Sequence, residues 1–255
     1  MNAERDTTGG RNAHGDGRGR GAAAAPLRRR LLARIQASHE HESQFVTVRR
    51  GAGDWSEQPG ARRKPLAQTD LAESSLIELS PGATLPHAPG FTQIELVLLH
   101  GDARLAEREL RCGDALCMPQ RDGPALRAGP HGARLYVRLS RPAAPTVQVE
   151  HFSALEDDDA SWLDFCPGVR IKPLWDGGER RSVLVRMQPG ASVNAHGHAL
   201  EEECMMLGGE AFIGDTLLRS MEYQLAPQGS RHGAITTDVG ALFYVHGSLD
   251  PAAYL

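Results

Sequence analysis

Short apolar runs alternate with polar positions along most of the chain, and each run ends at a turn rich in glycine or proline. Examples are RSVLVRMQPG, ECMMLGGEAFIG and GALFYVHGS, in which Val, Leu, Ile, Phe and Met predominate. Runs of this length between Pro-Gly and Gly-Gly turns are typical of β-strands. The pattern predicts an all-β fold of small antiparallel sandwiches or barrels, closed so that few strand edges face solvent.

A helical pattern occurs near the N-terminus. Four apolar residues share one face at helical spacing, namely Leu27, Leu31, Leu32 and Ile35. Pro26 suits the first helical position, because its missing N–H would have no partner there. We expect one short amphipathic helix over residues 26–42 that docks on the domain following it.

Residues 1–25 are rich in Gly, Arg and Ala and carry no apolar periodicity. A segment of this composition cannot bury enough apolar surface to offset its ordering entropy, so we expect a disordered tail. The first 30 residues hold seven arginines against three acidic residues. That charge fits an arm for an acidic partner or a solvated tail, and the solvated tail needs no further assumption.

The rest of the chain repeats itself with an offset of 108 residues. PGARRKPL at 59–66 returns as PGVRIKPL at 167–174, and GARLYV at 132–137 returns as GALFYV at 240–245. The Pro-Gly, Leu-x-Gly and Pro-Gln segments between them keep the same register. A register kept over about 100 residues indicates two tandem copies of one domain.

The repeat sets the domain boundaries. We assign the first copy to residues 43–140 and the second to residues 161–255. Residues 141–160 form the linker, with prolines near one end and an acidic cluster at the other.

Charge and cysteine content narrow the compartment and the partners. Twenty-eight basic against 32 acidic residues give a net charge of −4, so no global positive field indicates binding to nucleic acid or to a membrane. The four cysteines form no CxxC pair, and the chain shows neither a signal peptide nor a transmembrane run. We therefore expect a cytoplasmic protein in a reducing compartment.

The second copy contains a histidine and glutamate motif. Gly190 precedes the segment His196-Gly-His198, Glu202 follows, and a later Pro-Gln-Gly turn leads to His232. On a strand His196 and His198 point to the same face, because successive side chains alternate. A hairpin would return Glu202 beside them, and a later strand would bring His232 across the barrel. Three imidazoles and one carboxylate would bind one divalent metal ion, with Fe, Zn, Mn and Ni all compatible.

The first copy lacks this motif. The equivalent positions are occupied by Ala88, Gly90, Ile94 and Pro124. His87 lies one residue out of register and would point to the other face of a strand. We expect a metal-free first barrel, which also indicates that the fold does not require the ligands.

The spacing of both motifs resembles that of the cupin superfamily, G-x5-H-x-H-x3–4-E-x6-G followed by P-x-G-x2-H. The longer run from PGVRIKPL through NAHGHALEEE to PQGSRH resembles the cupin domain of ChrR-type anti-sigma factors and their stand-alone relatives. The likeness covers residues 161–248 well and residues 55–140 more weakly. It implies two tandem cupin jelly-roll barrels, with His196, His198, Glu202 and His232 as metal ligands.

The resemblance departs from the family at the glutamates. Where the family reads GGEE, this chain has Leu-Glu-Glu-Glu at 200–203. Glu203 is therefore an alternative ligand to Glu202, although strand parity favours Glu202. Cys204 and Met206 share that parity, so a thiol and a thioether would face the metal chamber, where they either report oxidants or fill the barrel.

Aromatic residues on neighbouring strands are further chamber candidates. They are Phe212, Tyr223 and Tyr244. Tyr244 recurs as Tyr136 in the metal-free copy, which favours a packing role for it.

Two functions stay open. The resemblance implies a bacterial metal-dependent regulatory or sensor module connected with oxidative stress. ChrR-type factors also have an N-terminal zinc domain with a CxxC pair that holds a sigma factor, whereas this chain has no cysteine before Cys112. Sigma binding is therefore not implied.

The alternative is an Fe(II)-dependent dioxygenase that cleaves a diketone or a hydroxyketone, with the metal as Lewis acid and template. Either function would place a small molecule in the second barrel. The sequence identifies no catalytic residue and does not decide whether the protein is an enzyme. Because cupin relatives commonly pair, a homodimer is expected.

Overall fold

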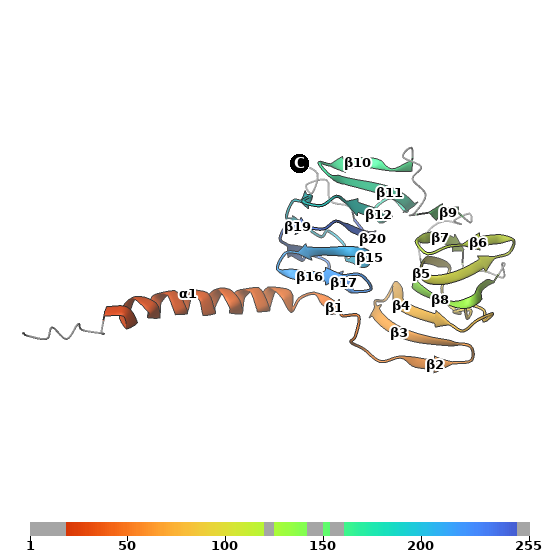
Figure 1. Cartoon of the computed structure of the whole chain (residues 1–255), viewed down its shortest axis with the longest axis horizontal. Coiled ribbons are helices and arrows are strands. Elements are labelled where there is room, and N and C mark those ends of the chain that lie inside the picture. Colours follow the sequence, from red (N-terminus) through yellow and green to blue (C-terminus); the bar gives the residue numbers. More distant parts are fainter. Residues whose placement is uncertain (1–18, 120–124, 142–149, 154–160, 249–255) are drawn as a thin grey trace, which may run out of the picture. The chain divides into compact units, whose positions relative to one another are not determined.

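The computed structural model describes residues 19–119, 125–141, 150–153 and 161–248. Within these ranges the chain forms one helix and two β-domains (Figure 1). The chain divides into one compact unit over Met1–His41 and a second over Glu42–Leu255, which holds both β-domains. No helix in the described part of the chain has the length and hydropathy needed to cross a membrane.

Helix α1 spans Gly19–Glu42 and begins seven residues before the predicted start at Pro26. Residues 19–25, which the sequence predicted to be disordered, thus belong to the helix. The run Ala22–Ala25 accounts for this, because alanine has the highest intrinsic helix propensity. Pro26 lies inside the helix rather than at its first position. The apolar residues of its predicted face are exposed, namely Leu27, Leu31, Leu32 and Ile35. Residues 1–18 of the predicted tail lie outside the described ranges.

The first β-domain is one antiparallel sheet of eight strands in the order β2-β3-β4-β8-β5-β7-β9, with β6 paired to β5. Its strands are β2 (Ser56–Gln58), β3 (Ala61–Gln68), β4 (Ala72–Leu79), β5 (Gln93–Leu105), β6 (Arg108–Leu110), β7 (Asp114–Pro119), β8 (Leu126–Ser140) and β9 (Glu150–Ser153). Long strands such as β5 and β8 curl the sheet around an apolar interior, which is the jelly-roll arrangement expected from the sequence.

The second β-domain repeats this plan in a ten-stranded sheet ordered β1-β17-β15-β20-β12-β11-β10, to which β13, β16 and β19 add, and in a separate pair, β14 and β18. Its strands are β1 (Val46–Val48), β10 (Leu163–Cys166), β11 (Val169–Asp176), β12 (Arg181–Met187), β13 (Ser192–Val193), β14 (His196–Gly197), β15 (Glu202–Ile213), β16 (Thr216–Arg219), β17 (Tyr223–Ala226), β18 (Arg231–His232), β19 (Ile235–Thr236) and β20 (Ala241–Gly247).

Two strands lie outside the domain to which the sequence assigned them. Strand β1 falls within the predicted first domain, yet it pairs with β17 of the second sheet. Strand β9 falls within the predicted linker, yet it pairs with β7 of the first sheet. Each domain therefore takes one edge strand from beyond the boundary drawn by the repeat, because an exposed edge is satisfied by any extended segment that reaches it.

The sequence repeat reappears as a repeat of sheet irregularities. The bulge between β3 and β4 falls at Pro65 and Ala67, and its counterpart between β11 and β12 falls at Pro173 and Trp175. A second bulge recurs in the same way between β5 and β8 and between β15 and β20. Bulges bend the strand and increase its twist, so the two sheets bend at equivalent positions of the repeat.

Two glycine pairs keep the long strands close at the second bulge. A Cβ atom at Gly209, whose φ is +68°, would overlap the carbonyl oxygen of Gly240. Gly101 is in the same position opposite Gly132, with a φ of +81°. Only glycine combines this backbone conformation with so close an approach, which explains the repeated Leu-x-Gly segments.

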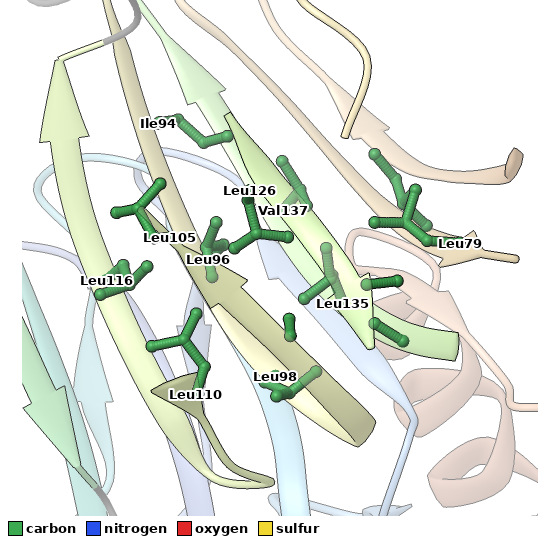
Figure 2. Packing of buried hydrophobic residues seen from close by; sticks show 14 of the residues in the cluster. Leu79, Ile94, Leu96, Leu98, Leu105, Leu110, Leu116, Leu126, Leu135 and Val137 are labelled. Carbon is green, nitrogen blue, oxygen red and sulfur yellow. The ribbon is translucent and has the colours of Figure 1, made fainter. Parts of the chain in front are cut away.

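The apolar interior divides into three clusters. One fills the first barrel, where leucines of β4, β5, β7 and β8 point toward one another (Figure 2). The second fills the second barrel and includes Val185, Met206 and Phe243. The third lies between the barrels and combines residues of both, such as Leu76 with Leu184.

A buried polar network crosses this third cluster. Arg138 on β8 donates to Glu95 on β5, with 3.3 Å from Nη1 to Oε1, and to Glu203 on β15, with 2.9 Å from Nε to Oε1. The hydroxyl groups of Tyr136 and Tyr223 donate to the other oxygen of Glu203 at 3.1 and 2.8 Å. A cation of the first barrel thus neutralises a carboxylate of the second.

The tyrosine hydroxyl groups and the guanidinium group of Arg138 keep their protons in this network. Burial, reinforced by the charge of Glu203, raises the pKa of Tyr136 and of Tyr223 well above the usual value. Burial alone would lower the pKa of Arg138, but Glu203 and Glu95 outweigh it and raise that pKa. Ser74 also donates to Glu203, so this carboxylate accepts hydrogen bonds from four side chains.

We expect Arg138→Met to lower the free energy of unfolding by about 3–5 kcal/mol, because removing one partner leaves two buried carboxylates without a cation. The matched control is Arg134→Met on the same strand. Arg134 pairs with Glu78, but its side chain is 38% exposed, and exposed pairs contribute less than about 1 kcal/mol. Urea denaturation of the full chain measures the free energy of unfolding of both variants. Equal losses in the two variants would contradict the role given to Arg138.

Candidate metal centre

Four side chains of the second barrel converge in one place. His196 on β14 and His232 on β18 are direct partners in a short antiparallel pair. His198 follows β14, and Glu202 opens β15. One ligand atom from each of the four residues lies within 4.8 Å of the others, which is the spacing of groups that share one ion.

Backbone carbonyl groups orient two of the imidazoles. The Nδ1 atom of His196 lies 2.8 Å from the carbonyl oxygen of Asn194, and Nδ1 of His232 lies 2.8 Å from that of Gly233. Because a carbonyl oxygen only accepts, each Nδ1 carries a proton, so in the neutral form of either imidazole the free electron pair is on Nε2. This is how histidine ligands are held in other metal sites.

His198 shows why the cluster fits a cation. Both of its ring nitrogens are buried without a hydrogen-bond partner among the described residues. Its Nδ1 lies 3.6 Å from Oε2 of Glu202, beyond hydrogen-bond distance. An unsatisfied buried nitrogen costs about 1–3 kcal/mol, and a metal ion between the imidazoles and the carboxylate would remove that cost.

The protonation states agree with metal binding. Burial opposes ionisation of Glu202, but His198 and the other two imidazoles outweigh it and hold the pKa of this carboxyl below its usual range. Burial lowers the pKa of His232 to about 4. At neutral pH these two residues are in the deprotonated forms that ligands must have.

The second barrel also matches a known domain family. Residues 151–250 match the family described as the ChrR cupin-like domain. No curated protein sequence matches the chain.

Solved structures share the two-barrel fold of this chain. A putative dioxygenase from Nostoc punctiforme has a TM-score of 0.64 at 18% identity, covering 83% of this chain and 86% of the other. An oxalate decarboxylase variant from Bacillus subtilis has a TM-score of 0.57 at 14% identity, covering 82% of each chain. Oxalate decarboxylase from Lactobacillus farciminis reaches 0.58 at 12% identity, covering 80% of this chain and 86% of the other. At these identities the similarity establishes the fold.

The alternative ligand Glu203 points away from the candidate metal centre. It accepts its hydrogen bonds in the network between the barrels, and its side chain is 3% exposed. Glu202 is the neighbouring residue on β15, so alternation along the strand sends the two carboxylates to opposite faces. The geometry therefore places Glu202, and not Glu203, in the cluster.

The sulfur-containing candidates lie in the interior of the second barrel. Cys204 and Met206 both belong to its apolar cluster. Burial, together with the charge of Glu202, raises the pKa of the Cys204 thiol far above its usual value. A thiol that stays protonated is a poor nucleophile toward oxidants, so the packing role is favoured over the reporting role.

The aromatic candidates are not at the metal centre. Phe212 is 41% exposed, because the bulge between Met206 and Gly208 reverses the parity of β15. Tyr223 and Tyr244 point into the network between the barrels, where they donate to Glu203 and Glu95. The sequence prediction of Phe212 and Tyr223 as chamber residues was therefore wrong, because the bulge turns Phe212 outward and Tyr223 faces the network between the barrels.

One aromatic neighbour was missed. The ring of Phe45 lies 6.4 Å from that of His232, centroid to centroid. Phe45 precedes β1, which joins the second sheet through β17. Repeat-based domain boundaries placed it in the first barrel, and nothing in the local pattern signals that this segment crosses over.

We expect wild-type protein to hold about one equivalent of a divalent transition metal, and Glu202→Gln and His198→Ala to lose it, because each removes one ligand atom. Glu201→Gln is the matched control, since Glu201 is paired with Arg180 at 2.7 Å rather than with the histidines. Elemental analysis of the purified variants measures this. A full equivalent in Glu202→Gln would refute the ligand assignment.

Metal-free protein is expected to lose stability as pH falls from about 6.5 to about 4. The folded state holds the pKa of His232 near 4 against an ordinary value of 6.5, so in this window only the unfolded chain takes up the proton. The contribution of His232 is on the order of 3 kcal/mol, present above pH 6.5 and lost as pH reaches 4.

The measurement is urea denaturation with chelator at about pH 7 and pH 4.5. His246, whose pKa is also lowered by burial, adds a loss of the same sign, so the comparison is with His232→Gln. If His232→Gln loses as much stability as wild type between pH 7 and pH 4.5, the loss cannot be assigned to His232.

Proposed function

We propose that the second barrel binds one divalent transition-metal ion through His196, His198, Glu202 and His232, and that the protein is a metal-dependent regulatory module. The observation that carries the metal site is the convergence of four ligand atoms, one of them from His198, whose ring nitrogens have no hydrogen-bond partner in the part of the chain that the structure describes. The match to the ChrR cupin-like domain favours a regulatory use, and the sequence resemblance connects that use with oxidative stress.

In this proposal each residue has a defined task. His196 and His232 hold their Nε2 atoms toward the site through backbone carbonyls. Glu202 supplies the negative charge that offsets part of the charge of a divalent cation. Phe45 packs beside His232. When bound, the metal supplies a Lewis-acid centre with positions open to water or to a small ligand.

Strand β15 supplies a physical link from the site to the rest of the molecule. Adjacent residues on this strand serve the metal cluster and the network between the barrels, Glu202 in the first and Glu203 in the second. A change in ligation that moves Glu202 must therefore displace Glu203 or strain the strand. This coupling supports a module whose first barrel responds to the metal state of the second.

A catalytic use is the second candidate. The similarity to the putative dioxygenase from Nostoc punctiforme and the open positions of a three-histidine, one-glutamate site favour an Fe(II)-dependent dioxygenase acting on a diketone or a hydroxyketone. Tyr223 is engaged by Glu203 and Phe212 is exposed. Tyr223 would therefore not provide acid–base catalysis, and Phe212 has no titratable group.

The deciding experiment uses metal-loaded protein with two readouts. A regulatory module should release metal on treatment with hydrogen peroxide and should show no oxygen uptake with acetylacetone or 2-hydroxyacetophenone above that of Glu202→Gln. Release should be equal in Cys204→Ala, because the Cys204 thiol stays protonated. Iron-dependent oxygen uptake that Glu202→Gln abolishes would replace the regulatory proposal with the dioxygenase.

A further inference from the structure

The first barrel contains a cavity of about 270 Å³. Its apolar wall includes Leu85, Ala88, Phe91, Ile94, Val137 and Leu139. Two of these, Ala88 and Ile94, occupy the positions that His196 and Glu202 hold in the second copy. The cavity of the first barrel therefore lies at the position that the candidate metal centre has in the second barrel. The first barrel lacks the ligand side chains there, and a cavity is present instead.

The cavity has a buried apolar end and a polar end nearer to solvent. Ile94 and Val137, seen on neighbouring strands in Figure 2, are 2% and 1% exposed. Arg63 and Glu73 also line the cavity, and their side chains are 31% and 20% exposed. His87, which the sequence placed on the opposite face of a strand, lies in a loop and borders the same cavity with an exposed side chain.

Charge at the polar end is balanced. Nη2 of Arg63 lies 2.9 Å from Oε2 of Glu73. A carboxylate ligand would have to displace Glu73 or lie against it, whereas a neutral carbonyl group can share the five N–H donors of the guanidinium. The polar end thus favours an uncharged hydrogen-bond acceptor.

Volume limits the size of the ligand. A cavity of about 150 Å³ lined by apolar side chains accommodates benzene, so about 270 Å³ suits a molecule of about ten non-hydrogen atoms. Pockets with apolar walls and a few polar groups at one end are typical of small-molecule sites.

We propose that the first barrel binds a small neutral molecule with an apolar, ring-sized body and one carbonyl or similar acceptor directed at Arg63. The site is separate from the metal centre and does not depend on its assignment. It gives the barrel without ligands a binding role of its own, beyond that of a scaffold for the second barrel.

The test measures binding of acetophenone to the full-length protein by calorimetry and by ligand-observed NMR. Wild type should bind one equivalent saturably, Ala88→Leu should bind at least tenfold more weakly because leucine fills the cavity, and His198→Ala should bind as wild type does. Benzoate, equal in size but anionic, should bind at least tenfold more weakly than acetophenone.

Three results would overturn the proposal: no saturable binding to wild type, undiminished binding to Ala88→Leu, or loss of binding in His198→Ala, which would place the ligand at the metal centre. Benzoate binding as tightly as acetophenone would refute the neutral class. If the unfolding midpoint shows that Ala88→Leu does not fold, Leu85→Phe replaces it. This substitution narrows the cavity from its partly exposed side, and it should weaken acetophenone binding as Ala88→Leu would.

Discussion

The charge pair between Arg138 and Glu203 is the interaction on which the arrangement of both barrels depends. It joins a strand of the first barrel to a strand of the second, and both side chains are almost completely removed from solvent. Two buried charges are tolerated only when each finds an opposite charge and further hydrogen bonds. Glu95, the tyrosines and Ser74 supply these, so both carboxylates of the cluster keep charged and hydrogen-bonded partners while they are buried between the barrels.

The same carboxylate is linked to the position of the candidate metal centre. Glu203 is held between the barrels, so its neighbour Glu202 must face the interior of the second barrel, beside the three histidines. One strand thereby serves two purposes at adjacent positions. Strand parity favoured Glu202 from the sequence, and the contacts of Glu203 with the partner barrel agree with that choice.

The two barrels show how a repeated fold separates structure from chemistry. Two of their bulges and their glycine pairs coincide at the repeat offset, so both sheets bend at equivalent positions. Their chambers differ completely, because alanine and isoleucine stand where histidine and glutamate stand in the other copy. The packing of the sheet depends on turns and apolar faces, and the ligand positions are free to become a metal centre or an apolar cavity.

Local patterns in the sequence determined the all-β class, the tandem repeat and the four residues of the candidate metal centre. Strand alternation, turn residues and motif spacing act over a few residues, so they can be read without knowing the partners of a strand. Tertiary structure alone decided the crossing of β1, the addition of β9, the position of Phe45 beside His232 and the outward turn of Phe212. These features depend on which distant segment reaches a sheet edge and on a bulge that inserts one residue into the alternation, and neither leaves a trace in the local order of apolar and polar residues.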